Sequence, residues 1–489
     1  MFGRMVRRVG LAVLLCLHTG LAAQTIAITN VTVIDGTGAQ PRTSRDVIVE
    51  GGKIRSERAT GATLPASATR IDGTGQYLLP GFIDSNAHAS VYGNPNRRDT
   101  SSRYGEQGEA LALEFAQRQL RYGVTTIRDS YGVLPPLLAV RDRIARGEAV
   151  GARMLVAGNI VGWGGPFSLT FSLTKDSDLT FFQESWNDLL TQGAGEELAD
   201  LTPEELRPAI QAYLAKGVDF VKYGGTSHFL RPSLIGFSPD QQKVIVEETH
   251  KAGKIAETHA TSPEGLKLAI MAGIDLIQHP ELMSRDMPDS LVRLIVSRDV
   301  LCGMRSNVFT GAAYQRQQAS RAEAQAKIAA MPPPRTSSER WRRFEMVGEP
   351  VAIERRNAEL LVRANCRVTI ATDNFLGDAP EFRRNPKPPE QEPGIGSLMA
   401  IEGLVELGMT PMQALVAGTR NGAAAAGMAD TLGTIAPGKI ADLVLLSADP
   451  LADISNIRKT SAVIAAGRLV DLASLPQAPV FGEQPGVMP

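Results

Sequence analysis

Several short apolar runs in this sequence contain or end in a polar or ionisable side chain of the kind that binds metal ions. They carry Asn86 and His88 in "GFIDSNAH", Lys222 in "VDFVKYGG", His259 in "KIAETHA", His279 in "LIQHP" and Asp373 in "TIATDN". Neutral imidazoles, a carboxylate and oxygen donors that meet at one point suit zinc or a similar divalent ion. These residues are therefore the candidates for one metal-dependent site.

Lys222 is unusual because it lies inside an otherwise apolar run. Burial of an unpaired ammonium group is costly. Either an acidic partner or a reaction with carbon dioxide would remove this cost. The reaction gives a carbamate, an anion that could bridge two metal ions. The residues alone leave both solutions open.

The elements around these residues alternate between short apolar strands and amphipathic helices. This order is typical of parallel strands joined by helices. The predicted strands are Gly81–Asn86, Val124–Asp129, Met154–Gly158, Phe220–Gly224, Ile255–His259, Leu276–His279, Val300–Gly303 and Val368–Asp373. The sequence therefore predicts an α/β fold of the (β/α)8 TIM-like barrel type.

The candidate residues lie at the ends of these predicted strands. In a (β/α)8 barrel the active site forms at the carboxyl ends of the strands. Residues two apart in a strand point to the same side, so Asn86 and His88 are both expected to face the barrel mouth. The barrel would thus bring the candidates together.

The two ends of the chain have a different pattern from its middle. Residues 24–76 and 431–475 consist of short alternating strands and turns, and we expect them to form one small β-sandwich domain. The barrel would occupy residues 77–430, with long loops at 160–206 and 305–350 that exceed usual loop lengths and suggest functional covers. The Pro- and Gly-rich segment 476–489 is expected to be a loose tail.

Residues 1–23 have the features of a secretory signal peptide, with three arginines before a short apolar run and small residues at Ala22 and Ala23. The run is too short for a stable membrane anchor. We therefore expect a periplasmic or secreted protein. The formal net charge of −1, without basic clusters, argues against nucleic acid as a partner.

Two cysteines, Cys302 and Cys366, remain after removal of the signal peptide, and both lie in apolar runs. Their number and spacing fit neither a disulfide scaffold nor a CxxC metal motif. Small buried thiols are the favoured interpretation. If the two strands are neighbours, an exported protein could instead oxidise the pair to a disulfide.

The order of these motifs resembles the amidohydrolase superfamily, and within it the exported relatives of imidazolonepropionases and Xaa-Pro dipeptidases. The resemblance covers nearly the whole mature chain. It rests on "PGFID", "GVTTIRD", "GVDFVKYGG", "HKAGKIAETHATSPEGLKLAIMAGIDLIQHP", "ATDN" and "GTIAPGKIADLVLLSADPLADI". Single motifs of this kind are weak, but their shared order together with both flanking β segments is specific.

The resemblance implies a role for each candidate residue. His88 would bind the more buried metal, a carboxylated Lys222 would bridge two ions, His259 and His279 would hold the second ion, and Asp373 would bind metal and carry the proton. Asn86 departs from the family pattern, in which a histidine stands there. A neutral amide is a poorer zinc ligand than imidazole, so Asn86 is predicted to be a weak or lost ligand. One or two ions are expected, zinc above all, with manganese as the alternative.

The implied reaction is hydrolysis of an amide, peptide or cyclic amide bond by metal-activated water, with Asp373 as general base and acid. A small-molecule amide or peptide is the expected partner, and self-association into a homo-oligomer is left open. A catalytically silent barrel that acts as a periplasmic binding protein and a mononuclear deaminase are the alternatives. The retention of four of the five usual sites argues against the first, and Lys222 argues against the second.

Three further residues have weaker claims to the site. His228, just after the Lys222 strand, is a candidate substrate contact. Arg128 and Asp129 end the second predicted strand, where an ion pair that supports the metal ligands is expected. The glycine-rich segment "GNIVGWGGPFS" lacks the histidine that many peptidase-like relatives use to hold a substrate carboxylate, so dipeptidase specificity is not favoured.

Overall fold

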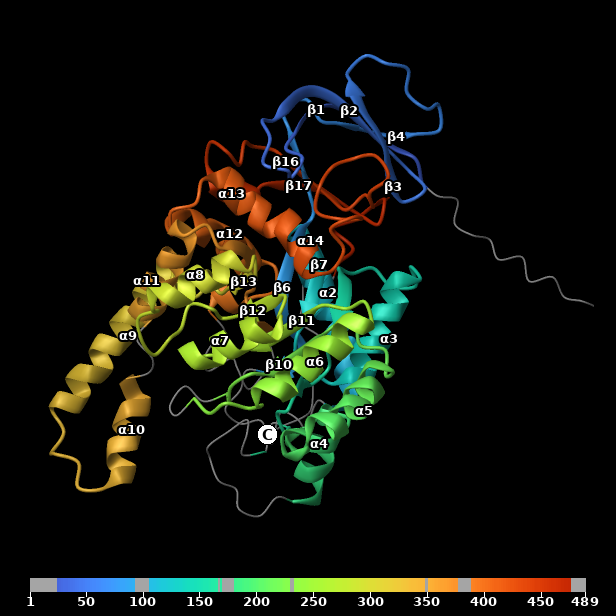
Figure 1. The fold of residues 1–489 in the computed structure, drawn as a ribbon. Coiled ribbons are helices and arrows are strands. Elements are labelled where there is room, and N and C mark those ends of the chain that lie inside the picture. Colours follow the sequence, from blue (N-terminus) through green and yellow to red (C-terminus); the bar gives the residue numbers. More distant parts are fainter. Residues whose placement is uncertain are drawn as a thin grey trace, which may run out of the picture.

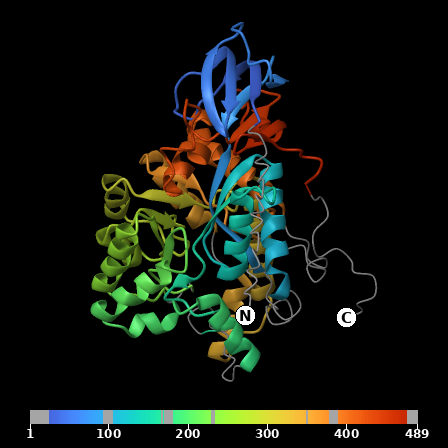
Figure 2. The same ribbon diagram turned by 90° about the vertical axis from the view of Figure 1, so that its right-hand side faces the viewer.

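The computed structural model describes residues 24–92, 105–165, 168, 180–228, 233–347, 351–376 and 388–475. The predicted signal peptide and C-terminal tail lie outside these residues. A β-sheet occupies one end of the molecule and a larger α/β body lies below it (Figures 1 and 2). Within the described ranges, no helix is both long and apolar enough to cross a membrane.

The sheet at the end of the molecule combines strands from both ends of the chain. Its order is β18-β17-β16-β5-β1-β2-β3, with β4 paired to β1. The strands are β1 (Ile26–Val33), β2 (Arg42–Glu50), β3 (Lys53–Ala59), β4 (Thr69–Asp72), β5 (Tyr77–Pro80), β16 (Leu443–Leu446), β17 (Thr460–Ala465) and β18 (Arg468–Leu469). Antiparallel pairing of β5 with β16 joins the two ends of the chain. The predicted β-sandwich is not confirmed, because these strands form one hydrogen-bonded sheet.

The hairpin of β2 and β3 shows how the sequence sets this local structure. Gly51 and Gly52 connect the strands and both have positive φ, 62° and 80°. Two-residue turns that match the twist of a hairpin require such values, which glycine adopts without steric cost. This hairpin agrees with the short strands and turns expected in residues 24–76.

The α/β body contains parallel strands whose order follows the sequence. They are β6 (Phe82–Tyr92), β7 (Val124–Asp129), β8 (Arg153–Val156), β9 (Ile160–Val161), β10 (Val221–Gly224), β11 (Ala256–His259), β12 (Leu276–Gln278), β13 (Leu301–Met304), β14 (Arg367–Ile370) and β15 (Asn374–Leu376). They form two sheets, β15-β6-β7-β8 and β14-β13-β12-β11-β10-β9. The eight predicted strands are thus present. Because they form two hydrogen-bonded sheets and not one, the pairing from strand to strand is interrupted at two places.

Single backbone hydrogen bonds connect the two sheets at both interruptions. The Asp219 N–H donates to the Val156 carbonyl over 2.7 Å, beside β8 and β10, and the Asp373 N–H donates to the Asn86 carbonyl over 2.9 Å, beside β14 and β6. The Ser85 and Thr369 hydroxyl oxygens also lie 2.8 Å apart across the second interruption. These contacts place the edge strands of the two sheets next to each other.

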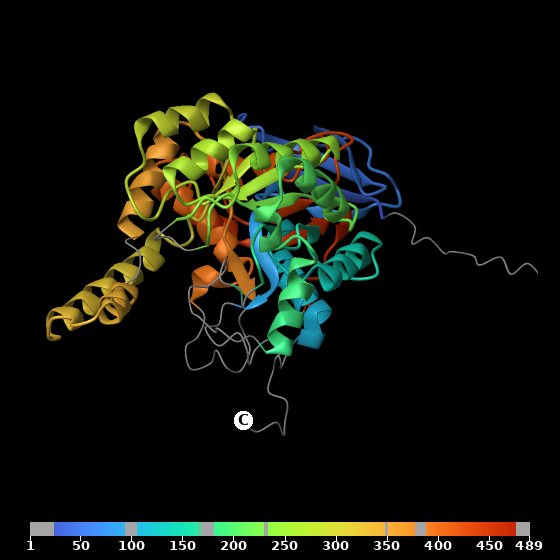
Figure 3. The ribbon, with the colours of Figure 1, turned by 60° about the horizontal axis from the view of Figure 1, so that its bottom comes forward.

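Helices cover the outside of these strands (Figures 1 and 3). They are α2 (Gly108–Arg121), α3 (Leu134–Ala145), α4 (Phe181–Thr191), α5 (Pro203–Leu214), α6 (Pro239–Lys251), α7 (Pro263–Ala272), α8 (Asp289–Ser297), α9 (Gly311–Ala329), α10 (Ser337–Val347), α11 (Val351–Arg363), α12 (Ile395–Glu406), α13 (Pro411–Val416) and α14 (Gly422–Ala425). Short turns add 3-10 helices at Gly105–Gln107, Glu196–Asp200, Pro389–Gln391 and Ile454–Arg458 and a π-helix at Ala417–Asn421.

Helix α6 shows which face of β10 is turned inward. The Tyr223 hydroxyl donates to Gln242 of α6 over 3.0 Å, so Tyr223 points outward to the helices. Strand alternation then directs its neighbour Lys222 to the interior.

Helices α5, α6 and α13 start with a Thr or Ser cap followed by proline, and each makes both hydrogen bonds of a capping box, which fixes the start of the helix.

The two long connections contain helices of their own. The first includes α4 and α5, and the second includes α9 and α10. Helix α9 ends at Ala329, shortly before the Pro332–Pro334 run. Helices α9 and α10 form a hairpin that projects away from the rest of the body (Figures 1 and 3).

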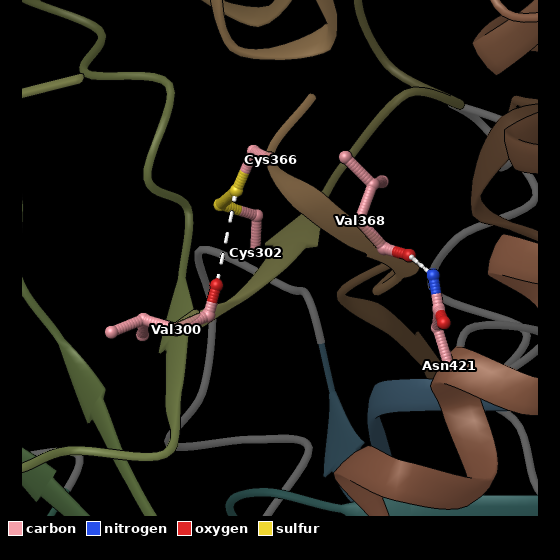
Figure 4. The surroundings of a disulfide bond; sticks show 5 residues. All are labelled: Val300, Cys302, Cys366, Val368 and Asn421. Atoms are coloured by element: carbon pink, nitrogen blue, oxygen red, sulfur yellow. Dashed lines mark hydrogen bonds between the residues drawn. A yellow bond between two sulfur atoms is a disulfide. The ribbon is translucent and has the colours of Figure 1, made fainter. Parts of the chain in front are cut away.

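A disulfide joins Cys302 of β13 to Cys366, which directly precedes β14 (Figure 4). Parallel pairing of the two strands places Cys302 opposite Val368 and brings the Cα atoms of the cysteines to 6.5 Å. Both side chains are buried. The two cysteines therefore form a disulfide between neighbouring strands, and the favoured interpretation as free buried thiols is wrong.

Asp84 of β6 ties its strand to the segment after β14. Its carboxylate is fully buried and accepts hydrogen bonds from the Thr372 N–H (3.1 Å), the Thr372 hydroxyl (2.6 Å), the Ser397 hydroxyl of α12 (2.8 Å) and the Asn86 N–H (3.3 Å). Burial raises the pKa of Asp84, while these donors favour its charged form. Asp84 thus fixes the backbone just before Asp373.

Removal of the disulfide in a Cys302→Ser/Cys366→Ser variant should lower the free energy of unfolding by up to about 4 kcal/mol, because the bond spans 64 residues of chain. Chemical denaturation with and without reductant measures this. Reductant should destabilise the natural chain and leave the double variant unchanged. Equal stability of the natural chain in both conditions would contradict the prediction.

Replacement of Asp84 by alanine should lower the free energy of unfolding by at least about 3 kcal/mol, because it leaves the N–H groups of Asn86 and Thr372 unpaired. Asp84→Asn is the matched control. Its amide can accept from the N–H groups and donate to the two hydroxyls, so its loss should be smaller. Urea denaturation compares the variants, and equal losses would show that the hydrogen bonds are not the cause.

Candidate active site

The candidate residues meet around the Asp373 carboxylate at the carboxyl ends of the strands. Asp373 Oδ1 lies 2.8 Å from His88 Nε2 and accepts a hydrogen bond from Asn86 Nδ2 over 3.3 Å. Asp373 Oδ2 lies 3.8 Å from His279 Nε2. The structure thus brings together residues of β6 and of the segments after β12 and β14, although they are far apart in the sequence.

The backbone of two of these residues is unusual. His279, which directly follows β12, has a φ of 59°. Asp373, which lies just beyond β14, has a φ of 60°. Residues other than glycine rarely adopt left-handed values, which persist only when the surroundings hold them. A register shift between Asp84 and Ala87 in the pairing of β6 with β7 further changes the direction of the chain at Asn86.

His88 is held in a defined orientation. Its Nδ1 lies 3.0 Å from the Tyr131 carbonyl oxygen, which can only accept a hydrogen bond. Nδ1 therefore carries a proton, and Nε2 is the atom directed at Asp373. A hydrogen bond from one imidazole nitrogen to a carbonyl is the usual way in which proteins orient a histidine that binds metal through the other nitrogen.

His259 and His279 provide two further imidazoles. Their ring centroids lie 5.5 Å apart, and both side chains are buried. Burial lowers the pKa of each well below its usual value, so both rings are neutral near pH 7. His259 Nε2 and His279 Nδ1 are buried and have no hydrogen-bond partner among the described residues. Buried imidazole nitrogens without partners suit a metal ion.

Asp373 is the anionic centre of the group. Burial would raise the pKa of its carboxyl, but the neighbouring His279 and His88 and the Arg305 guanidinium outweigh burial and hold it well below the usual value. Asp373 is therefore a carboxylate near pH 7. A carboxylate surrounded by imidazoles is a donor set that zinc and manganese accept.

Lys222 of β10 lies on the face of the strand that is turned away from α6. It is buried and makes no hydrogen bond or ion pair with any residue that the structure describes. Burial lowers its pKa. A lysine paired with a carboxylate is therefore not observed, because Glu257, the acidic group that acts most strongly on Lys222, is bound to Arg128 over 2.6 Å.

Arg128 and Asp129 point in different directions. Arg128 faces the interior and pairs with Glu257, whereas Asp129 Oδ2 accepts a hydrogen bond from the Ala89 N–H over 2.6 Å. Burial raises the pKa of Asp129 to about 7. The two residues do not form the ion pair that the sequence suggested. Asp129 instead fixes the backbone next to His88.

His228 and Trp163 lie on the β9–β10 side of the group. The rings of His228 and His259 have centroids 6.2 Å apart, and the Trp163 ring packs edge-on against both, at 5.3 Å and 4.8 Å. The Trp163 indole N–H donates to the Thr226 carbonyl over 3.0 Å. Gly224 makes this packing possible, since a Cβ there would lie 2.1 Å from the indole nitrogen.

The sequence interpretation missed a charged group on the opposite side. Arg305 directly follows β13, and it contacts Glu354 of α11 over 2.6 Å and Asp373 Oδ2 over 3.5 Å. Glu281 lies nearby, where burial and the Glu354 charge raise its pKa to about 8. Like the other candidates, Arg305 is a polar residue at the end of an apolar strand. It was not recognised because the strand was predicted to end at Gly303, whereas it extends one residue further, to Met304.

The donor chemistry of the group fits a divalent metal, although its spacing is not that of a formed metal site. Among the described residues, no three His, Cys, Asp or Glu side chains surround one point closely enough to hold an ion. His88 and Asp373 instead bond to each other. Neutral imidazoles, an anionic carboxylate and buried nitrogens without partners are nevertheless the ligands that a metal requires.

Two curated proteins show similarity over most of the chain. The ochratoxinase of Aspergillus niger is 24% identical over 401 residues, which cover 79% of this chain and 73% of the relative. The imidazolonepropionase of Anaeromyxobacter sp. (strain K) is 25% identical over 470 residues, which cover 87% of this chain and 90% of the relative.

Solved structures are similar over nearly the whole chain. Molinate hydrolase has a TM-score of 0.83 and 29% identity, with 96% of this chain and 100% of that chain covered. Phenylurea hydrolase B has a TM-score of 0.82 and 32% identity, with coverages of 94% and 100%. A Xaa-Pro dipeptidase, at 20% identity and a TM-score of 0.68, supports the fold alone. These structures support a TIM-barrel-like α/β fold.

Residues 77–470 match the amidohydrolase family, a span that covers the strand ends described above. The family is generally metal-dependent, in agreement with the donor set around Asp373. The resemblance noted from the sequence motifs is confirmed, and so is the prediction of an enzyme. The chain belongs to the amidohydrolase family, a family of hydrolases that act on carbon–nitrogen bonds.

Proposed function

We propose that the chain is an exported, metal-dependent hydrolase that cleaves an amide, peptide or cyclic amide bond of a small molecule. The observation that carries the proposal is the meeting of His88, His279 and Asp373 at the ends of three strands. Beside them stands Lys222, a buried lysine without a partner among the described residues. This combination suits chemistry on a metal and has no evident structural purpose.

The residues that would hold the metal are His88, His259, His279, Asp373 and Lys222 as its carbamate, with Asn86 as a weak or lost ligand. Zinc is the ion that this set favours, manganese is the alternative, and one or two ions fit the change at Asn86. When bound, the metal polarises the scissile carbonyl and lowers the pKa of a bound water to about 7.

Asp373 would carry the proton. As a carboxylate, it accepts a proton from the attacking water and then delivers one to the leaving nitrogen. His88, fixed through Nδ1 by the Tyr131 carbonyl, and Arg305, fixed by Glu354, hold the two oxygens of Asp373 from opposite sides. This support keeps the carboxylate in one orientation during both transfers.

The substrate is proposed to be a small organic amide. The similar proteins include molinate hydrolase, phenylurea hydrolase B and ochratoxinase. The segment after β9 carries Trp163, and no histidine, against His259 and His228. An apolar ring beside the site favours an uncharged substituent over a free carboxylate, and His228 is the proposed polar substrate contact.

Export to the periplasm or the outside of the cell is proposed from the signal peptide in residues 1–23. The disulfide between Cys302 and Cys366 supports it, since disulfides persist in oxidising compartments. We also propose a complete (β/α)8 barrel. The hydrogen bonds from Asp219 to Val156 and from Asp373 to Asn86 support this closure.

Asp373→Asn should lower kcat by about 10²- to 10⁴-fold, because the amide cannot transfer the proton. Hydrolysis of a panel of N-acyl amino acids, dipeptides, cyclic amides and phenylureas with zinc present provides the measurement. Asp299→Asn, which changes an exposed carboxylate, should retain activity. Undiminished turnover by the Asp373 variant would contradict its role.

Asn86→His should increase the amount of zinc that the protein retains after dialysis against a chelator, since imidazole is the better zinc ligand. Elemental analysis of the dialysed protein measures retention. Asn86→Ala should retain no more than the natural chain. If the histidine variant also holds no additional zinc, residue 86 does not face the metal.

A further inference from the structure

Glu257 is the cross-strand neighbour of Lys222. The parallel pairing of β10 with β11 places Lys222 opposite Glu257, and both side chains face the interior of the strand ring. Glu257 is buried and is the acidic group that acts most strongly on Lys222. A carboxylate beside a buried lysine would ordinarily form an ion pair with it, because each charge would offset the burial of the other.

The Glu257 carboxylate is instead bound from the other side of the interior. Arg128 Nη1 of β7 donates to Glu257 Oε2 over 2.6 Å, and Gln278 Nε2 of β12 donates to the same oxygen over 3.2 Å. The guanidinium lies 3.8 Å from the ring centre of Phe220 and also reaches the Ser85 carbonyl. Arg128 is thus fully buried and held through Nη1 and the Phe220 ring.

Lys222 remains without a hydrogen-bond or ion-pair partner among the residues that the structure describes, although Glu257 has capacity for one. Glu257 Oε1 is buried and accepts no hydrogen bond from a described residue. The carboxylate could therefore bind a second donor if it turned towards β10. Its contacts with Arg128 and Gln278 fix it in the orientation observed.

Resting on the function proposed above, we propose that Arg128 is a positioning residue that holds Glu257 away from Lys222 and thereby leaves the Lys222 nitrogen open to carbon dioxide. In that reaction the lone pair of the Lys222 nitrogen forms a bond to the carbon of carbon dioxide. One C–O π bond breaks, its electron pair moves to oxygen, and the nitrogen releases a proton to water. A Lys222 nitrogen that donates to the Glu257 carboxylate would be directed at that carboxylate and not at carbon dioxide.

A purely structural role of the Arg128–Glu257 pair makes a different prediction. In that case both partners would serve only to neutralise each other, and the loss of either would affect stability without any specific effect on Lys222. The two roles separate when Arg128 is removed first alone and then together with the carboxylate of Glu257.

The experiment measures the carbamate on Lys222 directly. The purified chain and its variants are incubated with zinc and ¹³C-labelled bicarbonate, and the ¹³C NMR signal of the carbamate is compared per mole of folded protein. Arg128→Met should reduce the signal at least about tenfold, a change equivalent to about 1.4 kcal/mol. Arg128→Lys keeps a cation for Glu257 and should retain most of the signal. Arg128→Met/Glu257→Gln removes the competing carboxylate and should restore it.

Each outcome supports or overturns the proposal. An undiminished signal in folded Arg128→Met, or a double variant that folds but lacks the signal, would overturn it. If Arg128→Met does not fold, the double variant decides alone, since a buried ion pair can be removed whole with little loss of stability. Absence of the signal in the natural chain would instead refute the carboxylated Lys222 of the proposed function, so the two failures are distinguishable.

Discussion

The cost of burying charged groups among the parallel strands is the constraint on which the site depends. Arg128 and Glu257 are fully buried and pair over 2.6 Å, and Lys222 lies beside them at the same level of the strands. A buried charge without a partner is strongly destabilising. The pair therefore neutralises its own charges and leaves Lys222 without an ion-pair partner among the described residues.

A second level of side chains lies closer to the carboxyl ends, and it depends on the backbone there. His279 and Asp373 both have left-handed φ values, which other contacts must hold in place. Asp84 provides such contacts, because it binds the N–H and the hydroxyl of Thr372, directly before Asp373. The orientation of Asp373 therefore originates in a fully buried carboxylate that points away from the site, towards Ser397 of α12.

The elements that local patterns define could be predicted from the sequence. Strand β7 has the predicted bounds Val124–Asp129, and His259 is the last residue of β11, as expected. Each such segment is a short apolar run that pairs with the strand before it and the strand after it in the sequence. The predicted strand ends therefore place His259 and Asp373 at the same edge of the strands without any knowledge of contacts.

The features that depend on contacts between distant segments could not be predicted in this way. The pairing of β5 with β16 is set by packing between the two ends of the chain, so an alternating pattern did not distinguish a single sheet from a sandwich. The partner of Arg128 is Glu257, 129 residues away, and not its neighbour Asp129. Arg305 was missed for a local reason, since strand ends are the least certain part of such an interpretation.

The contacts of Asn86 argue that it is adapted to this site. Its Nδ2 donates to Asp373 Oδ1, the atom that also faces His88 Nε2. Its Oδ1 is buried and has no hydrogen-bond partner in the described part of the chain. The amide thus carries a donor and an acceptor on one planar group. While the nitrogen orients Asp373, the oxygen remains available as a neutral ligand. Asn86 thus holds Asp373 through its nitrogen, while its oxygen has no partner among the described residues.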